Sequence, residues 1–227
     1  MGAIIKANAR QTTSVQRPDE GAEVELRLIR DGSIAIADYI TAMSLEGRIM
    51  STNAGTVTTP IECGAGGIDT TEPDLIVIAP ATVAIIPIEI IINVEAYGST
   101  AIFEAMWSFG LGGVQGTVTA GTVQNTNTLS AYQSQCTSGN ASGADSTYWT
   151  SKAVEVARWN AAKAVTVSTA DDDSAWPPVQ FVWTAASSGV LPVISGTGAG
   201  FMVFASAQAS TAFITAKWIE LPVSAVR

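Results

Sequence analysis

The segment Pro73–Tyr97 carries a long stretch of apolar residues, PDLIVIAPATVAIIPIEIIINVEAY. Its pattern predicts two β-strands that are apolar on both faces, with Pro80 and Pro87 marking the link between them. In the second strand, we expect one row of side chains to contain Ile86, Ile88, Ile90 and Ile92. The opposite row is expected to contain Ile85, Pro87, Glu89, Ile91 and Asn93.

Only one of these two rows is needed for the core of a sandwich. The second row could contact another subunit. Alternatively, both rows could lie in one core that the segment 114–145 covers. The apolar pattern does not favour either alternative.

Short alternating patterns separated by turn signals run through the rest of the chain. A hairpin is predicted over 24–40, where Val24, Leu26 and Leu28 alternate with other residues before the turn at Asp31–Gly32. Further strands are predicted over 46–50, 102–109, part of 114–125, 153–167, 179–185, 201–207 and 212–221, and loops over 133–146 and 189–200.

No segment shows a sustained apolar period of 3.6 residues, and the segments total roughly ten short strands. This pattern is typical of an all-β sandwich or barrel. We therefore predict a single β domain over 23–227, preceded by an extended N-terminal arm over 1–22.

Charged residues make up 14% of the 227 residues, whereas about 25% is usual in soluble domains. A surface rich in Thr, Ser, Ala and Gly indicates that partners cover much of it, although a large core would give the same composition. Histidine is absent, which removes the commonest general base and the commonest metal ligand. The net charge of −9, without a cluster of Lys and Arg, argues against nucleic-acid binding.

The arm is the basic part of an acidic chain. Lys6, Arg10 and Arg17 lie in it before the first acidic residue, Asp19. Such a segment could reach a partner, or it could be a terminus with incidental charge. The two alternatives carry equal weight.

Cys63 and Cys136 lie far apart without metal-type spacing, so we expect two free, buried thiols. The chain starts without an apolar signal segment, and the apolar run 75–88 is shorter than the roughly twenty residues of a membrane span. We therefore expect a protein that is made in a cytoplasm and does not cross a membrane.

Candidate chemistry is sparse. Asp171–Asp173 could bind calcium, but successive acids point in different directions and a solvated loop is the better interpretation. Gly196–Gly200 lacks the following helix of a phosphate-binding loop, which favours a tight turn. Trp149 and Trp176 could stack on sugars, with local packing as the alternative that we favour. We predict no catalytic residue, cofactor or metal.

Four segments resemble a known family: IAPATVAIIPIEIII (78–92), PPVQFVW (177–183), GFMVFASA (200–207) and KWIELP (217–222). Together with the arm and the hairpin, they are similar to tailed-bacteriophage virion proteins with one jelly-roll domain, of the capsid decoration (cement) type. The resemblance covers about residues 20–222 and consists of packing patterns. It implies a jelly-roll β-sandwich and a homotrimer that binds the major capsid protein on the outside of the phage head.

The resemblance also implies a structural role in the virion rather than an enzyme. For its interface we expect Ile4, Ile5, Lys6 and Arg10 of the arm, and the row of Ile86, Ile88, Ile90 and Ile92. The alternatives are the head of a fibre or spike that binds host glycans, and a jelly-roll major capsid protein. The first would need exposed aromatic loops, and the second a more basic arm.

Overall fold

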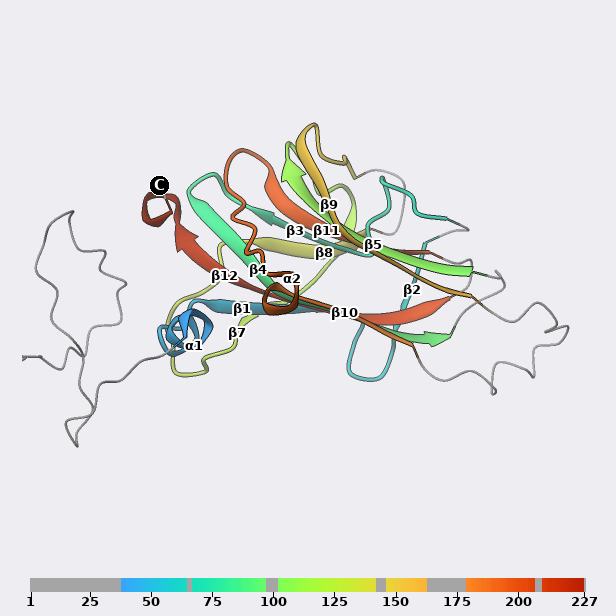
Figure 1. Ribbon diagram of the computed structural model, residues 1–227, viewed down its shortest axis with the longest axis horizontal. Helices are drawn as coiled ribbons and strands as arrows, with labels where there is room; N and C mark the ends of the chain where they lie inside the picture. Colours follow the sequence, from blue (N-terminus) through green and yellow to red (C-terminus); the bar gives the residue numbers. More distant parts are fainter. Residues whose placement is uncertain are drawn as a thin grey trace, which may run out of the picture.

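The computed structural model describes residues 38–64, 67–96, 102–141, 146–162, 179–206 and 210–226 (Figure 1). The N-terminal arm lies outside these residues, as does the predicted hairpin up to residue 37. Residues 38–40, which the hairpin was expected to include, belong instead to the start of a helix.

Two antiparallel sheets stack face to face, so the predicted all-β sandwich is confirmed (Figure 1). The strands of the described residues are β1 (Ile49–Ala54), β2 (Ile61–Glu62), β3 (Leu75–Ala79), β4 (Val83–Ala96), β5 (Ile102–Leu111), β6 (Val118–Ala120), β7 (Val123–Asn125), β8 (Thr137–Ala141), β9 (Ser151–Ala162), β10 (Gln180–Thr184), β11 (Ala199–Ser206) and β12 (Thr211–Pro222). Short helices are α1 (Tyr39–Leu45), α2 (Ala185–Ser188) and the 3-10 turn η2 (Val223–Ala225).

The first sheet has the order β10-β4-β12-β1-β7, with β2 also paired to β12. The second sheet has the order β6-β8-β3-β11-β5-β9. Strand β12 is the centre of the first sheet, because it pairs with β4 along its whole length and with β1 on its other side. The chain therefore has to bring its two most distant described strands, β1 and β12, together.

The core between the sheets contains a group of aromatic rings. Trp107 of β5 and Trp183 of β10 meet edge to face, with ring centroids 4.5 Å apart. Phe201 of β11 contacts Trp218 of β12 in the same way at 5.8 Å. Each pair joins one sheet to the other. Burial of such side chains stabilises the fold by about 1.5–3 kcal/mol each, so these rings contribute substantially to holding the two sheets together.

Strand β4 contains a bulge, and the bulge overturns the predicted isoleucine row. Pro87 pairs with Trp218 and Glu89 pairs with Lys217, so Ile88 between them has no partner in the register. Pro87 lacks an N–H group, which suits an irregular position inside a strand rather than a link between strands. Of the two prolines, only Pro80 lies at a turn, where its carbonyl accepts from the Val83 N–H.

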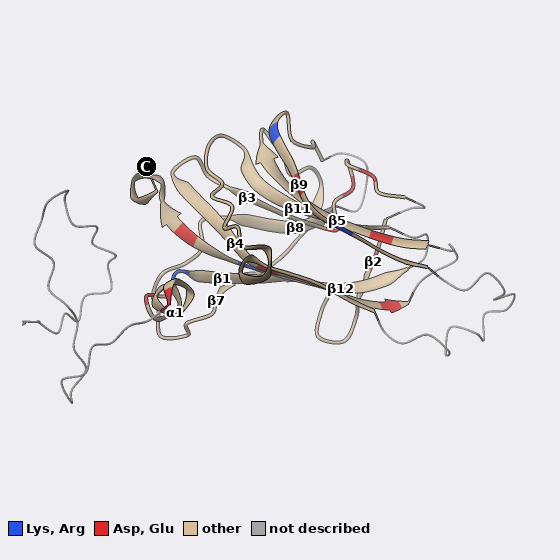
Figure 2. Ribbon diagram, viewed as in Figure 1, with Lys and Arg blue, Asp and Glu red and all other residues tan. Residues whose placement is uncertain are grey.

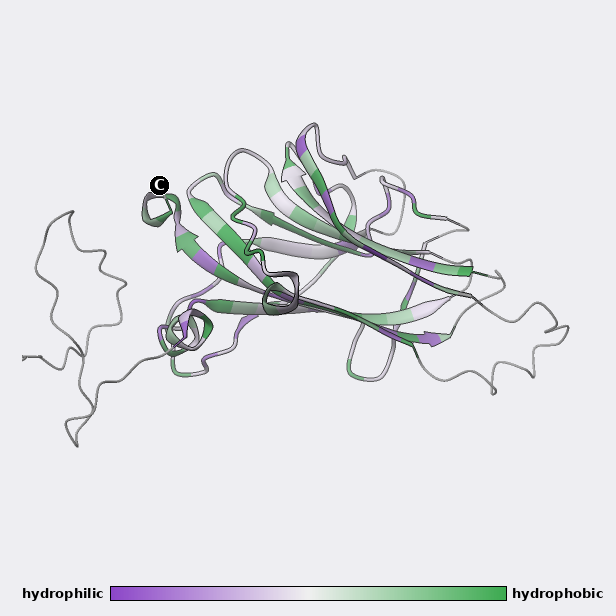
Figure 3. Cartoon of the chain, in the orientation of Figure 1, coloured by the Kyte–Doolittle hydropathy of each residue, from purple (hydrophilic) through white to green (hydrophobic). Residues whose placement is uncertain are grey.

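One extra residue shifts the side-chain alternation of a strand by one position. Ile90 and Ile92 therefore join Ile85 in the core between the sheets. Ile86 and Ile88 lie on the outer face of the first sheet. The four isoleucines therefore do not form one row, although Figure 3 shows hydrophobic residues along most of β4.

Helix α1 was not predicted. Asp38 caps it, with its carboxylate accepting from the Thr41 N–H at 2.9 Å and from the Thr41 hydroxyl. The strand expected over 46–50 begins only at Ile49, after the helix ends at Leu45. Further elements were missed: the short strand β2, β8 within the predicted loop 133–146, α2 after β10 and the turn η2. The turn at Gly196–Gly200 is confirmed by positive φ at Gly196 and Gly198.

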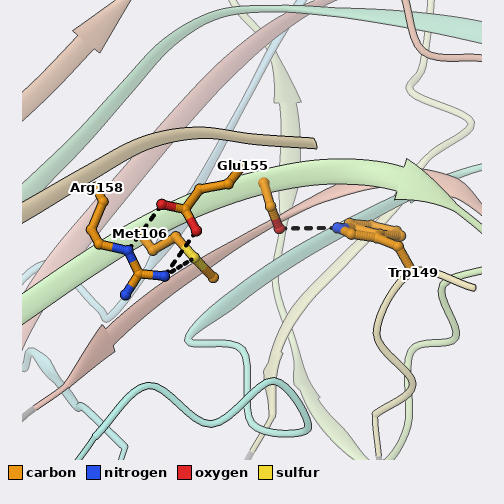
Figure 4. A network of polar contacts seen from close by, with 5 residues as sticks. Met106, Trp149, Glu155 and Arg158 are labelled. Atoms are coloured by element: carbon orange, nitrogen blue, oxygen red, sulfur yellow. Dashed lines mark hydrogen bonds and ion pairs between the residues drawn. The ribbon is translucent and has the colours of Figure 1, made fainter. Parts of the chain in front are cut away.

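The outer face of the second sheet is covered by the chain itself. Trp149 lies against it with Met106, Met202 and Phe204. Its ring occupies space that Gly110 and Gly113 leave open. A Cβ atom at Gly110 would lie 2.5 Å from Trp149 Cγ, and a Cβ atom at Gly113 would also meet the ring. The Trp149 indole N–H donates to Ser108 Oγ at 3.0 Å (Figure 4).

Candidate interaction surface

Among the described residues, the outer face of the first sheet is covered at one end. There, α1 lies over an apolar cluster, to which Met43 contributes from the helix. The other buried members are Ile49, Ile86, Ile88, Ile219 and Leu221. Of the predicted interface row, only Ile86 and Ile88 lie on this face, where α1 buries both.

The loop that follows β7 ties α1 to the sheet. Asn127 donates from its amide to the carbonyls of Ser44 and Leu45, at 3.2 Å each. Asn125 donates to the carbonyls of Gly47 and Tyr132. These bonds satisfy carbonyl groups at and beyond the helix end and fix the position of the helix. The cover over Ile86 and Ile88 is therefore part of the folded chain.

A cleft of about 550 Å³ lies between α1 and the sheet. Its walls include Ile40 and Leu45 of the helix region and Ile88 of the bulge. The Leu45 side chain is 70% exposed, although it belongs to an apolar wall. A large exposed leucine beside an apolar cleft is typical of a contact surface.

Beyond the cleft, the outer face is open to solvent and its middle rows carry neutral residues, while Glu95 lies exposed at the far end of β4. One row across the strands contains Val182, Ile91, Thr215 and Asn53. In the next row, Gln180 donates to Asn93 at 2.7 Å. The Thr215 hydroxyl donates to Asn53 Oδ1 at 2.8 Å. Val182 is 44% exposed at the edge of the sheet. We call these residues, with Glu89 and Lys217, the open face.

The charges of the open face cancel. Lys217 and Glu89 are opposite each other on β12 and β4 and form an ion pair. Both side chains are partly exposed, at 39% and 27%. Such a pair adds little stability, but it leaves the border between the open face and the cleft without net charge. Figure 2 shows how few charged residues the strands of this sheet carry.

Behind the sheet edge, a buried carboxylate holds the segment 132–136. Glu220 accepts from the Tyr132 hydroxyl, from the Gln135 N–H and from the Trp218 indole N–H. Ser134 donates to the carboxylate oxygen that also accepts from Trp218. Burial and the nearby Glu220 raise the pKa of Tyr132 to about 12. A carboxylate with so many donors is a structural anchor rather than a general base.

Both cysteines are free and buried, as the sequence predicted. Burial raises the pKa of the Cys63 and Cys136 thiols. A thiol that stays protonated is a poor nucleophile and a poor metal ligand. Neither cysteine therefore offers a reactive site.

The other candidates from the sequence fall into two groups. Trp149 is 6% exposed and cannot stack on a sugar, so its interpretation as local packing is correct. Trp176, Asp171–Asp173 and the arm residues Ile4, Ile5, Lys6 and Arg10 lie outside the described residues.

Among the described residues, no group of three or more Cys, Asp or Glu side chains could hold a metal ion. In the same part of the chain, no helix is long and apolar enough to cross a membrane. Comparison of the chain with protein-family models, with curated proteins and with solved structures gave no match.

The sequence did not identify the open face, because the predicted row followed an unbroken alternation through β4. The bulge moves Ile90 and Ile92 into the core and brings Glu89 and Ile91 to the outer face. A proline within an apolar strand was the only available signal of this change.

Proposed function

We propose that this protein is a structural virion protein that decorates and stabilises the capsid of a tailed bacteriophage. It binds the outer surface of the shell formed by the major capsid protein and acts as a homotrimer. It is made in the cytoplasm of the host bacterium and catalyses no reaction. The open face carries this proposal, because it is exposed, has a balanced ion pair and neutral middle rows, and borders a cleft with apolar walls.

We further propose that the sandwich is a jelly roll. In a jelly roll, two sheets of four strands are built from two Greek keys. The strand order supports this assignment: β10-β4-β12-β1 lies against β3-β11-β5-β9, and the remaining strands extend the sheets. The chain also changes sheet between β3 and β4, between β4 and β5, and at each step from β9 to β12.

A neutral face suits assembly around a symmetry axis, because identical surfaces of the subunits lie close to one another there. Like charges would face each other across such an axis and would oppose association. The Glu89–Lys217 pair avoids this cost. Many weak contacts repeated over a shell then give strong overall attachment.

The trimer is tested by measuring the mass of the full chain by light scattering at micromolar concentration. We expect a mass of three times 23.5 kDa. Val182→Asp should shift it toward the monomer, because a charge is placed on the open face. Val154→Asp on β9 is the matched control, since the two valines have nearly equal exposure, 44% and 43%, on edge strands of opposite sheets.

A monomer in the wild-type protein, or equal masses for the two variants, would remove the open face as the self-association surface. Attachment to the capsid is tested separately by co-sedimentation with phage heads that lack this protein. Replacement of Lys6 and Arg10 by alanine should abolish attachment and leave the trimer intact. Retained attachment would exclude the arm as the capsid contact.

A further inference from the structure

A groove of about 810 Å³ lies at the end of the first sheet remote from α1. Loop 55–60 forms one wall and the turn between β6 and β7 forms another. Leu75, Ile61 and Ile214 are the apolar residues at its base, and all three are buried. This volume lies within the range of pockets that bind small organic ligands, about 300–1,000 Å³.

Every side chain that lines the groove is uncharged. Its polar groups are the hydroxyls of Ser51, Thr56, Thr59, Thr119, Thr122 and Thr215 and the amides of Asn53, Gln124 and Asn140. Binding of a phosphate group would call for Lys or Arg, and binding of a hard cation would call for carboxylates. The lining therefore favours a neutral ligand.

Hydroxyl and amide groups can both donate and accept hydrogen bonds. A ligand that carries many hydroxyl groups has the same double capacity, so each of its groups can find a partner in such a lining. A purely apolar ligand would leave these groups without partners, which costs binding energy. The polar lining therefore matches a polyhydroxylated molecule.

Phe213 supplies an aromatic surface within this polar lining. Its ring lies against Gly55, where a Cβ atom would be 3.0 Å from Phe213 Cδ1 and where φ is +95°. Glycine at this position lets the loop approach the ring and hold it. A partly exposed aromatic ring can pack against the C–H face of a pyranose while the hydroxyls of the sugar bond to the walls.

The walls of the groove are held in place by hydrogen bonds. The Thr52 and Ser138 hydroxyls meet at 3.0 Å and join the two sheets below the β6–β7 turn. Gly121 N–H donates to the Ser138 carbonyl at 2.8 Å. In loop 55–60, Thr56 N–H donates to the Thr59 carbonyl at 2.8 Å. A preformed site loses less conformational entropy when a ligand binds.

We propose that this groove binds a neutral saccharide, with Phe213 as the stacking surface and the surrounding hydroxyl and amide groups as hydrogen-bonding partners. The saccharide site does not require the proposed trimer or capsid attachment, although the groove shares Asn53 and Thr215 with the open face. It differs from the tryptophan-based glycan site that the sequence suggested, because Trp149 is buried in the opposite sheet.

The test applies the full chain to an array of neutral and anionic glycans and then titrates the best neutral oligosaccharide by isothermal calorimetry. We expect binding of neutral glycans, and an affinity that falls about tenfold or more in Phe213→Ala. Leu129→Ala is the control, because this side chain is 95% exposed and does not line the groove. It should leave the affinity unchanged.

Gln124→Ala provides a second variant if Phe213→Ala folds poorly, because the Gln124 side chain is exposed. It should also weaken binding. The proposal is overturned if no neutral glycan binds, if only anionic glycans bind, or if folded variants keep wild-type affinity. Val182→Asp separates the two proposals, since it should change the mass of the assembly and not the affinity for the saccharide.

Discussion

The outer face of the second sheet and the outer face of the first sheet are covered to different extents. Over the second sheet, Trp149 fills the space above Gly110 and Gly113 and bonds to Ser108 (Figure 4). Over the first sheet, α1 covers Ile86 and Ile88 and leaves the rest of the face exposed.

The difference shows which outer face is covered by residues of the same chain and which is left for the proposed contact with a partner. An aromatic residue that packs over two glycines completes the second sheet without a partner. Among the described residues, no such side chain covers the open face, and its valine, threonine and amide residues are exposed or half-buried. Residues on the second sheet should therefore affect stability, and residues on the open face should affect association.

The largest effect is expected for Trp149→Ala. Removal of this buried ring leaves a cavity over Gly110 and Gly113, which should lower the free energy of unfolding by about 3–5 kcal/mol. Urea denaturation measures the loss, and Trp149→Phe should show a smaller one because most of the volume remains. A loss below about 1 kcal/mol in Trp149→Ala would contradict the assigned packing.

The second effect is a pH dependence that also arises on the second sheet. Asp74, at the boundary of β3, is buried and accepts from the Ala205 N–H of β11. Burial raises its pKa to about 7 from the ordinary value of 3.8. The folded state then binds a proton that the unfolded state has released, and stability should fall as pH rises from about 4 to about 7.

We expect a decrease of about 2–4 kcal/mol over this interval and a constant value above it. Urea titrations at several pH values measure it. Asp74→Asn is the control, because its amide oxygen can still accept from Ala205 and carries no charge. This variant should flatten the profile, and an unchanged slope would exclude Asp74 as its source.

A smaller effect is expected at the cleft beside α1. Leu45→Ala should change stability by less than about 0.5 kcal/mol, because the side chain is 70% exposed. If the cleft belongs to the subunit contact, the dissociation constant of the assembly should rise about tenfold. Sedimentation over a concentration series measures this constant. An unchanged constant would place the contact elsewhere on the open face.

The smallest effect is expected for Lys217→Ala. The pair with Glu89 is partly exposed, and its loss should cost less than about 1 kcal/mol in the isolated subunit. Its loss should weaken association further, because Glu89 is then unpaired at the border between the open face and the cleft. Double substitution of Lys217 and Glu89 by Ala should restore part of the association, as measured by light scattering. Failure of this rescue would argue that the pair has no role in the contact.

The sandwich could be predicted from the sequence because most strands show an alternation of apolar and polar residues. In β12, Phe213, Thr215, Lys217 and Ile219 were expected on one face and are found there. Strands β5, β10 and β11 also lie close to the predicted ranges. Regular alternation is a local property, so it can be recognised without knowledge of the partners of a strand.

The candidate surface could be predicted only in part, because it depends on the bulge in β4 and on helix α1, and neither is evident from the local sequence. The bulge at Ile88 is defined by its register against β12. Helix α1 is too short for a sustained apolar period, and only the Asp38–Thr41 cap indicated it. The role of Trp149 depends on glycines 36 or more positions away, which no local pattern reveals.

The position of β12 also determines when the protein can fold. Ile49 pairs with Ile219, so the centre of the first sheet cannot form until β12 has left the ribosome, long after β1. Thr215 and Lys217 on the same strand complete the open face. A nascent chain without β12 therefore lacks the surface that we propose for assembly.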